Sequence, residues 1–257
     1  MRQKAYQFVR KALSCLPVEH GPGLRILTYH RVDYSNQRLN VLPDRFKEQM
    51  KYLSEAGYIT LKNEELFRFR KSGFPEKSIM ITFDDGYKNN YTNVFPCLVE
   101  HGINVVIFLI TDYIGKEYTR EQILGWNEIK EMSRHGIDFG SHACAHRRLT
   151  ELPQSDIKTE VECSKKIIED NLGKKADLFC YPKGYYDRSV KEIVKAAGYR
   201  GACATEVGGN DRLTDVFSLK RTEISLYDDL EDFKAKLQGR FDLLHGAYAT
   251  WRRIRGE

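Results

Sequence analysis

Residues 79–86 read IMITFDDG, an apolar run that ends in two carboxylates and a glycine. A short β-branched run of this kind is typical of a buried strand. Because side chains alternate along a strand, Asp84 and Asp85 are predicted to point in different directions, so that one can bind a metal while the other holds a proton. The alternative interpretation of the same residues is a turn with a helix N-cap.

Outward from this stretch, short apolar runs alternate with segments spaced as helix faces. The runs 24–29, 79–83, 105–110, 137–140, 178–181, 202–204 and 217–219 are predicted strands, and 43–56, 94–99, 126–135, 157–172 and 190–197 are predicted helices. This order predicts an α/β fold with helices that cross over between parallel strands. About seven such units favour a barrel, with a doubly wound sheet as the alternative. No glycine-rich phosphate-binding motif follows any of these runs, so nothing favours nucleotide binding.

The composition excludes several protein classes. The 257 residues are 41% hydrophobic and 30% charged, which excludes a disordered chain. No run approaches the roughly 18 apolar residues of a membrane-spanning helix, and Arg10 and Lys11 interrupt the first apolar residues, so we expect no signal peptide. The net charge of +5 is weak for a nucleic-acid-binding protein. Six scattered cysteines without a C-x-x-C pair are typical of free thiols in a reducing compartment, so we expect a cytoplasmic protein.

Three segments are predicted along the chain. Residues 1–23 form a basic helical extension, 24–225 form the barrel, and 226–257 form a helical segment that packs on the barrel. The extension either packs on the barrel or contacts an anionic membrane face, and the basic tail 251–255 leaves the same two interpretations. A peripheral contact with the inner face of the membrane is therefore one expectation, and the sequence does not determine the oligomeric state.

Polar residues that could bind a metal, a substrate or a proton follow three other predicted strands. His142 and His146 are four residues apart, a spacing that places both rings on one face of a helical turn and suits a divalent ion, although two surface histidines would be the simpler interpretation. Cys144 would then point elsewhere, as a packed thiol. His30 closes the first strand as either a structural or an acid–base group. Residues 180–187, CYPKGYYD, form a turn whose tyrosines either offer a flat surface or pack inside.

Together these motifs resemble the polysaccharide deacetylase family, also called the NodB-homology family. The resemblance rests on TFDDG at 82–86 and on Ser141-His142 with His146, and it extends through YPKG at 181–184 and LKR at 219–221. It covers about residues 24–225, most of the chain. The start YHRV at 29–32 is most similar to the poly-N-acetylglucosamine deacetylase subgroup. The resemblance implies a single-domain, distorted (β/α)7 barrel, circularly permuted in that subgroup.

The resemblance also implies a role for each motif residue. Asp85, His142 and His146 would hold a divalent metal, usually zinc, with cobalt, nickel or iron as alternatives. Asp84 would be the general base that takes a proton from the metal-activated water. The metal and a backbone N–H near Lys183 would stabilise the oxyanion. A histidine would protonate the departing amine, and the products would be acetate and a free amino sugar.

The chain departs from the family pattern at two places. Many members carry an arginine just before the proline turn, where this chain has Phe179 and Cys180; Arg221 could supply that charge, or it could be a surface arginine. Many members also carry the catalytic histidine in a late Leu-x-Leu-His run, whose nearest match here ends at His245. Because the surroundings of that run read as helix, we favour His30 as the general acid and keep His245 as the alternative.

Candidate substrate-binding residues lie in the turn and at the start of one helix. They are Tyr181, Pro182, Lys183, Gly184, Tyr185 and Trp126, with Tyr186 as a further stacking candidate. Core packing is the alternative for Trp126, because it opens a helical pattern.

These residues predict a metal-dependent hydrolase that removes an N-acetyl group from an amino sugar in a cell-envelope glycan or a lipid-linked precursor. One alternative is a deformylase of a lipid-linked amino sugar. The other is a catalytically silent glycan-binding relative, which would have no chemical need for Asp84 and the three candidate metal ligands, yet all four are present. No nucleic-acid partner is expected.

Overall fold

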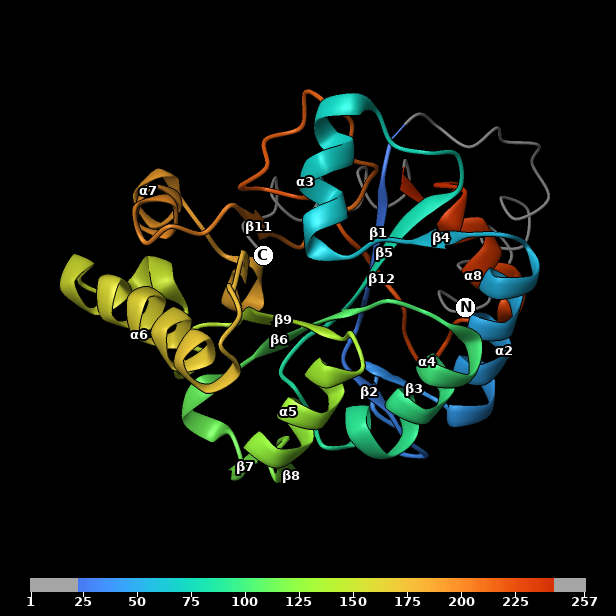
Figure 1. Cartoon of the computed structure of the whole chain (residues 1–257), viewed down its shortest axis with the longest axis horizontal. Helices are drawn as coiled ribbons and strands as arrows, with labels where there is room; N and C mark the ends of the chain where they lie inside the picture. The colour runs from blue at the N-terminus through green and yellow to red at the C-terminus, as the bar shows by residue number, and fades with distance from the viewer. Residues whose placement is uncertain (1–22, 243–257) are drawn as a thin grey trace, which may run out of the picture.

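A computed structural model describes residues 23–242 of the chain. Its centre is a parallel sheet in which seven strands follow the order β11-β10-β9-β6-β5-β1-β12, with β4 paired to β5 (Figure 1). The strands are β1 (Arg25–Tyr29), β4 (Ile59–Thr60), β5 (Ser78–Phe83), β6 (Val106–Leu109), β9 (Asp138–Ser141), β10 (Leu178–Cys180), β11 (Gly201–Cys203) and β12 (Thr222–Glu223). Two small sheets are added by β2 (Arg31–Val32) with β3 (Asn40–Val41), and by β7 (Glu117–Tyr118) with β8 (Glu121–Gln122).

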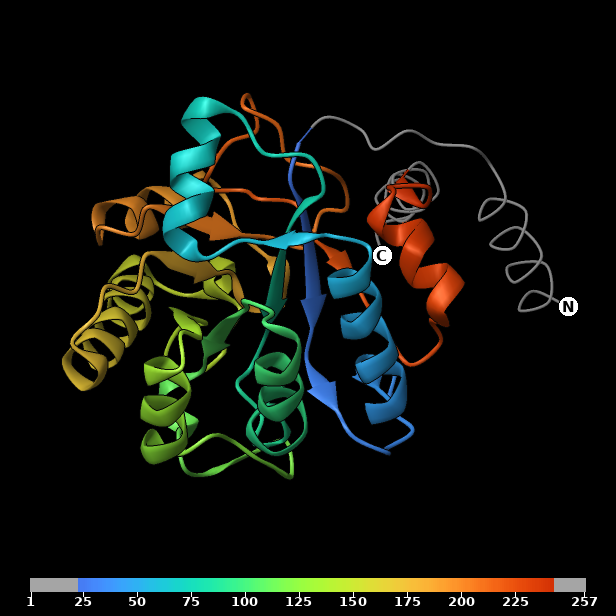
Figure 2. The ribbon, with the colours of Figure 1, turned by 45° about the vertical axis from the view of Figure 1, so that its right-hand side comes forward.

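Helices cover the outside of this sheet (Figure 2). They are α2 (Pro43–Glu55), α3 (Asn63–Ser72), α4 (Phe95–His101), α5 (Trp126–Arg134), α6 (Gln154–Leu172), α7 (Arg188–Ala196) and α8 (Leu230–Leu237). Among the described residues, no helix has the length and apolar character needed to cross a membrane.

The sheet is apolar on both faces, as a parallel sheet covered on both sides requires. All six residues of β5 are buried, and its side chains alternate between two core clusters: Met80 joins the inner one, and Ile79 and Ile81 join the one under the helices. Inside the curled sheet, a Cβ at Gly140 would lie 2.6 Å from the ring of Phe108. Glycine at that position therefore makes room for a large ring, whose burial contributes about 2 kcal/mol.

The two edges of the sheet are joined by the chain between β11 and β12. Leu219 pairs with β11, since its N–H donates to Ala202 O and its carbonyl accepts from Ala204 N, both at 2.9 Å. Three residues later Thr222 pairs with Leu27 of β1. One continuous segment thus touches both edges, and we call residues 219–223 the seam segment. The predicted α/β fold with a distorted barrel of seven strands is confirmed, and the circular permutation stays a prediction.

One prediction about elements is wrong, and one helix is missing from the predictions. Residues 217–219 do not form a strand, because Asp215 caps a turn there by accepting from Phe217 N at 2.9 Å, and the strand comes later, at Thr222. The helix α3 was not predicted at all. Its pattern NEELFRFRKS buries only three residues, Asn63, Leu66 and Phe67, so its apolar face is short.

The predicted segment boundaries fall partly outside the described residues. Apart from residue 23, the predicted extension 1–23 lies outside the described residues, and so does the basic tail 251–255. Of the predicted C-terminal segment, α8 lies beside α2 (Figure 2), and its Phe233 belongs to the same core cluster as Phe46 and Met50 of α2.

Candidate metal centre and active site

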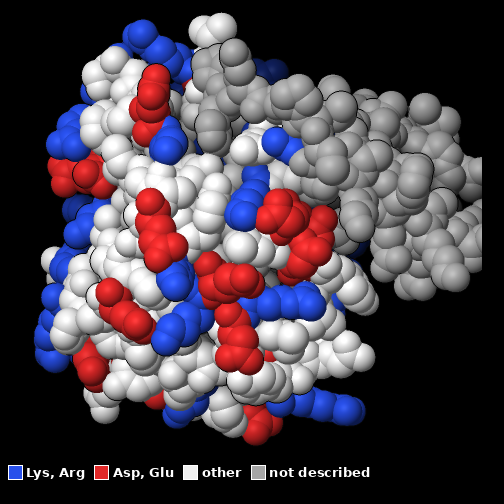
Figure 3. Space-filling model, turned by 90° about the vertical axis from the view of Figure 1, so that its right-hand side faces the viewer, with Lys and Arg blue, Asp and Glu red and all other residues white. Residues whose placement is uncertain are grey.

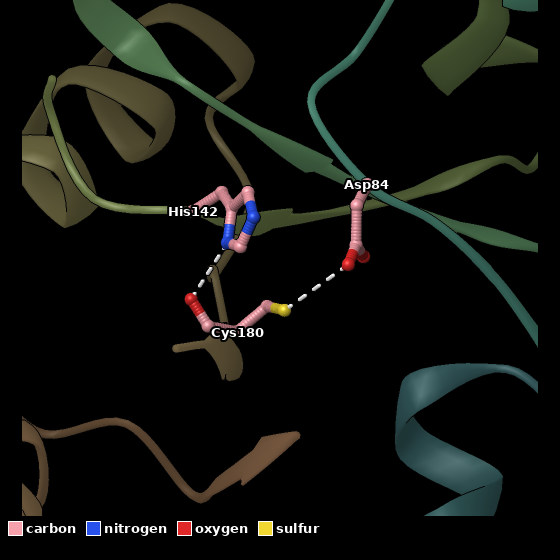
Figure 4. Close-up of side chains that lie close together, drawn as sticks. All are labelled: Asp84, His142 and Cys180. Carbon is pink, nitrogen blue, oxygen red and sulfur yellow. Dashed lines mark hydrogen bonds between the residues drawn. The ribbon is translucent and has the colours of Figure 1, made fainter. Parts of the chain in front are cut away.

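Polar side chains gather where the strands end. Asp84 follows β5, His142 follows β9 and Cys180 ends β10, and Figure 4 shows the three side chains facing one another. Arg221, just before β12, and His30, just after β1, belong to the same group, since each lies near Asp84. The carboxyl ends of parallel strands meet at one end of a barrel, where such folds carry their active sites.

Asp85, His142 and His146 form a candidate metal centre. The Nε2 atoms of His142 and His146 lie 3.7 Å and 3.6 Å from Asp85 Oδ1, and one ligand atom from each residue lies within 4.8 Å of the others. Asp85 Oδ1 is buried and has no hydrogen-bond partner among the described residues. A buried carboxylate oxygen without a partner is costly unless a cation or donor meets it, so these residues fit a divalent ion.

The far nitrogens of both rings are already bonded, which leaves Nε2 of each ring for the ion. His142 Nδ1 lies 2.8 Å from Cys180 O, and His146 Nδ1 lies 2.7 Å from the hydroxyl of Tyr118. Burial and the neighbouring His142 lower the pKa of His146 to about 3, so its ring is neutral. Burial raises the pKa of Asp85 to about 6, against the opposing charge of His142. Both pKa shifts indicate a pocket that disfavours an isolated charge on either side chain. A bound cation would offset that cost for the carboxylate of Asp85.

The prediction that a helical turn brings the two histidines together is wrong. Residues 142–146 form a loop, and Ala143 and His146 take left-handed conformations with φ of 63° and 56°. The loop is held from α6, where Glu160 Oε2 accepts from Cys144 N and Ala145 N, both at 2.9 Å. A carboxylate that accepts two consecutive amides can offset the cost of left-handed residues, about 1–3 kcal/mol each.

The two aspartates do point in different directions, as predicted, but the turn after β5 is the cause. Asp85 has φ of 71° and Gly86 has φ of 72°, so the chain turns sharply beyond Phe83. A Cβ at residue 86 would lie 2.8 Å from a methyl group of Leu109, which explains the glycine. The helix N-cap interpretation is wrong, because the next helical turn starts only at Asn90.

Asp84 is paired with Arg221. Nη1 and Nη2 of Arg221 donate to Oδ1 and Oδ2 of Asp84 at 2.7 Å and 2.8 Å, and both side chains are buried. Burial alone would raise the pKa of Asp84, but the charge and hydrogen bonds of Arg221 outweigh it and hold the pKa well below its usual range. Arg221 therefore lies where it can supply the missing charge, and the surface-arginine interpretation is wrong because its side chain is 2% exposed. Its role in catalysis stays a prediction.

Cys180 lies beside the ion pair of Arg221 and Asp84. Its Sγ lies 3.1 Å from Arg221 Nη2. It also lies 3.6 Å from Asp84 Oδ2, as Figure 4 shows. A small thiol at the end of β10 leaves space for the guanidinium group that comes from the seam segment.

His30 also lies near Asp84. Its Nε2 is 3.9 Å from Asp84 Oδ2, and its Nδ1 is buried without a partner among the described residues. Burial lowers the pKa of His30, and the charge of Asp84 opposes this shift. The alternative general acid, His245, lies outside the described residues.

Two of the predicted substrate-binding side chains are inaccessible. Tyr181 is fully buried and donates its hydroxyl to Phe217 O at 2.9 Å, and Pro182 is also buried, so neither ring is available to a ligand. Trp126 is half-buried and packs against the core cluster, which favours its packing interpretation.

Tyr185 and Lys183 remain at the surface of the turn. Tyr185 is 48% exposed, and the guanidinium carbon of Arg148 lies 4.1 Å from the centroid of its ring. Lys183 is exposed and has φ of 58°. Gly184 contributes by its small size, because a Cβ there would lie 2.0 Å from Thr205 Oγ1. Tyr186 stacks on Tyr181 with ring centroids 4.6 Å apart.

Sequence reasoning missed Tyr118, Cys180 and Glu160 as parts of this site. A signal existed for Glu160, since it falls on the buried face of α6 with Ile157 and Val161. Polar residues on an apolar helix face need buried partners. Nothing in the sequence around Tyr118 singles it out.

Known proteins resemble this chain in sequence and in structure. The polysaccharide deacetylase family matches residues 71–202. YxkH of Bacillus subtilis, whose name places it in that family, is 32% identical over 230 residues, 87% of this chain and 80% of YxkH. The poly-β-1,6-N-acetyl-D-glucosamine N-deacetylase of Staphylococcus aureus is 27% identical over 201 residues, 68% of this chain and 69% of that protein. The structure of the Streptococcus pyogenes deacetylase PplD in complex with acetate is 25% identical with a TM-score of 0.79, over 84% of this chain and 99% of PplD.

Proposed function

The chain belongs to the polysaccharide deacetylase family of carbohydrate hydrolases, and from this premise we propose that it is a metal-dependent N-deacetylase of amino sugars. The observation that supports this proposal is the position of an ionised Asp84, paired with Arg221, directly beside three side chains that fit a divalent ion. A silent glycan-binding protein would need neither group.

Asp85, His142 and His146 would hold the ion, with zinc as the first choice for two imidazoles and a carboxylate and with cobalt, nickel or iron as alternatives. The ion would supply Lewis acidity that polarises the amide carbonyl and activates a water molecule.

Asp84 and His30 would move the protons. The two hydrogen bonds from the guanidinium group of Arg221 keep Asp84 ionised. The carboxylate of Asp84 can therefore accept a proton from the attacking water. The water oxygen bonds to the acetyl carbon, and the carbon–nitrogen bond breaks. Nε2 of His30 lies 3.9 Å from Asp84 Oδ2, so a proton held between them can pass to the departing nitrogen. The products are acetate and a free amine.

The names of the relatives support a proposal for the substrate class. The Staphylococcus aureus relative is named for poly-β-1,6-N-acetyl-D-glucosamine, and PplD was solved with acetate. We therefore propose an N-acetylated glycan or its lipid-linked precursor, with Tyr185 and Lys183 at the rim where the sugar would lie. A cytoplasmic location with peripheral membrane contact stays a prediction.

Acetate release from N-acetylglucosamine oligosaccharides, with and without a chelator, tests the proposal. We expect release that stops on chelation and returns with added zinc or cobalt. Formate release from an N-formylated sugar with no acetate release would favour the deformylase. Binding of the oligosaccharides without turnover by the metal-loaded protein would favour the silent relative.

A further inference from the structure

We propose that Tyr118, on the β7–β8 hairpin, is a positioning residue that fixes the imidazole of His146 for metal binding. The proposal rests on the metal centre described above and adds to it a side chain from an element outside the main sheet.

The two histidines of the centre are held in different ways. His142 Nδ1 faces a backbone carbonyl at the end of β10, and its side chain is 3% exposed. His146 Nδ1 faces the Tyr118 hydroxyl at 2.7 Å, and its side chain is 12% exposed. The sheet therefore fixes the ring of His142, whereas the ring of His146 depends on the hairpin for its polar partner.

A hydrogen bond at the far nitrogen decides how an imidazole binds an ion. When Nε2 of His146 holds the ion, Nδ1 carries the ring proton and donates it to the oxygen of Tyr118. That bond selects one tautomer and stops rotation of the ring. The aromatic contact between Tyr118 and His146 is edge-on, with centroids 5.5 Å apart, so it adds packing without replacing the hydrogen bond.

The hairpin is in turn aligned with the segment that carries Asp85. Leu124 N donates to Gly86 O at 2.9 Å, Tyr87 and Ile123 form a bridge, and Lys88 N donates to Gln122 O at 2.8 Å. The chain next to one metal ligand thus sets the position of the hydroxyl that orients another.

The other side of the hairpin is also fixed. Glu121 pairs with the buried Arg31 at 2.5 Å, and Thr119 and Arg120 form a two-residue turn with φ of 50° and 67°, the conformation that suits a tight hairpin. Two non-glycine residues in left-handed conformations indicate that surrounding contacts hold this turn in place.

The variant Tyr118→Phe tests the proposal, because it removes the hydroxyl and keeps the ring. We expect a loss of about 10- to 100-fold in zinc affinity, the usual effect of removing the partner of a ligand histidine, measured by competition with a chromophoric chelator. Tyr113→Phe is the matched control, since Tyr113 packs on Tyr118 with ring centroids 4.8 Å apart; its zinc affinity should stay that of the unmodified protein.

A spectroscopic measurement separates positioning from general packing. In the cobalt-substituted protein, the Nδ1 protons of His142 and His146 should each give a shifted, exchangeable proton resonance. In Tyr118→Phe we expect the His146 resonance to be lost to exchange with water while the His142 resonance remains as an internal reference. Unchanged affinity with both resonances intact would overturn the proposal, and unmodified protein that binds no metal at all would overturn the proposed function with it.

Discussion

The ion pair between Arg221 and Asp84 affects both the stability of the fold and the proposed reaction. Both groups are buried, and Arg221 also donates through Nε to Ala204 O at 2.9 Å. Burying two charges costs solvation energy that their attraction only partly returns. Removing one partner costs more, because the other charge then stays buried without a counter-charge.

Arg221→Met should therefore destabilise the fold by about 3–5 kcal/mol, because it leaves the carboxylate of Asp84 buried and unpaired. Urea unfolding measures this, with Asp84→Asn and the double variant completing a cycle. We expect the double variant to lose less stability than the two single losses combined. Strict additivity would show that the two side chains do not depend on each other.

His30→Ala should lower acetate release by about 10²–10⁴-fold, the range for a lost general acid, and should leave bound zinc unchanged. Turnover and metal content measured on the same sample check both parts. Asp85→Ala is the contrasting variant, since it should lose zinc as well as activity. Full activity of His30→Ala would move the role to His245.

At this scale the chemistry could be predicted from the sequence but its geometry could not. Asp84, Asp85, His142, His146 and Arg221 were singled out by residue type and by position after strands. The left-handed conformation of Ala143 could not be inferred, because the loop is held by the hydrogen bond from the next residue, Cys144 N, to Glu160, 16 residues further along the chain. The burial of Tyr181 depends likewise on tertiary packing.

Among the elements, α6 supports the loop 142–146 through one carboxylate, that of Glu160. Glu160→Ala would leave Cys144 N and Ala145 N without their partner, at about 1–3 kcal/mol for each unsatisfied amide. We expect lower stability together with weaker zinc affinity, and Glu160→Gln, which keeps one acceptor, should lose less of both. Thermal unfolding and chelator competition measure the two effects; a stability loss with unchanged zinc affinity would limit Glu160 to a structural role.

The start of α3 depends on a carboxylate from β9. Asp138 Oδ2 accepts from Asn63 N at 2.8 Å, and burial raises the pKa of Asp138, against the opposing effect of that hydrogen bond. This long-range cap also explains why α3 could not be predicted, since the residue before it is Lys62, which is a poor local start signal.

Because burial raises the pKa of Asp138, the folded protein holds the proton of this carboxyl more tightly than the unfolded chain does. The stabilisation is complete below the unfolded pKa of about 3.9 and is lost as the pH rises through the folded value. The variant Asp138→Asn keeps an acceptor for Asn63 N. Its free energy of unfolding, minus that of the unmodified protein, should therefore be more positive at neutral pH than at acid pH. A difference between the two proteins that is constant with pH would contradict this reading of Asp138.

On the scale of the whole molecule, metal binding should stabilise the folded state only. At a free zinc concentration of about 100 times the dissociation constant, the gain is about 2.7 kcal/mol. Thermal unfolding with zinc and with a chelator measures it, and Asp85→Ala should abolish the difference. A zinc-dependent shift that survives in Asp85→Ala would place the ion elsewhere.

The surface carries both charge signs in close alternation. Figure 3 shows lysine and arginine interspersed with aspartate and glutamate on the side that includes α2 and α8. Many of these are exposed pairs such as Lys51–Glu55 and Lys47–Glu100, which contribute about 0–1 kcal/mol each. The fold therefore depends on its three apolar clusters. That is why the short apolar runs were enough to predict an α/β fold with parallel strands, whereas the choice of a distorted barrel over a doubly wound sheet also rested on the family resemblance.

The seam segment links the closure of the sheet to the charge state of Asp84. Residues 219–223 join the last edge of the sheet to the first, and the same five residues carry the counter-charge of Asp84. The pairing that joins the two edges of the sheet and the ion pair that keeps Asp84 charged therefore depend on the same segment. A substitution that displaces this segment is expected to lower both the stability of the fold and the rate of acetate release.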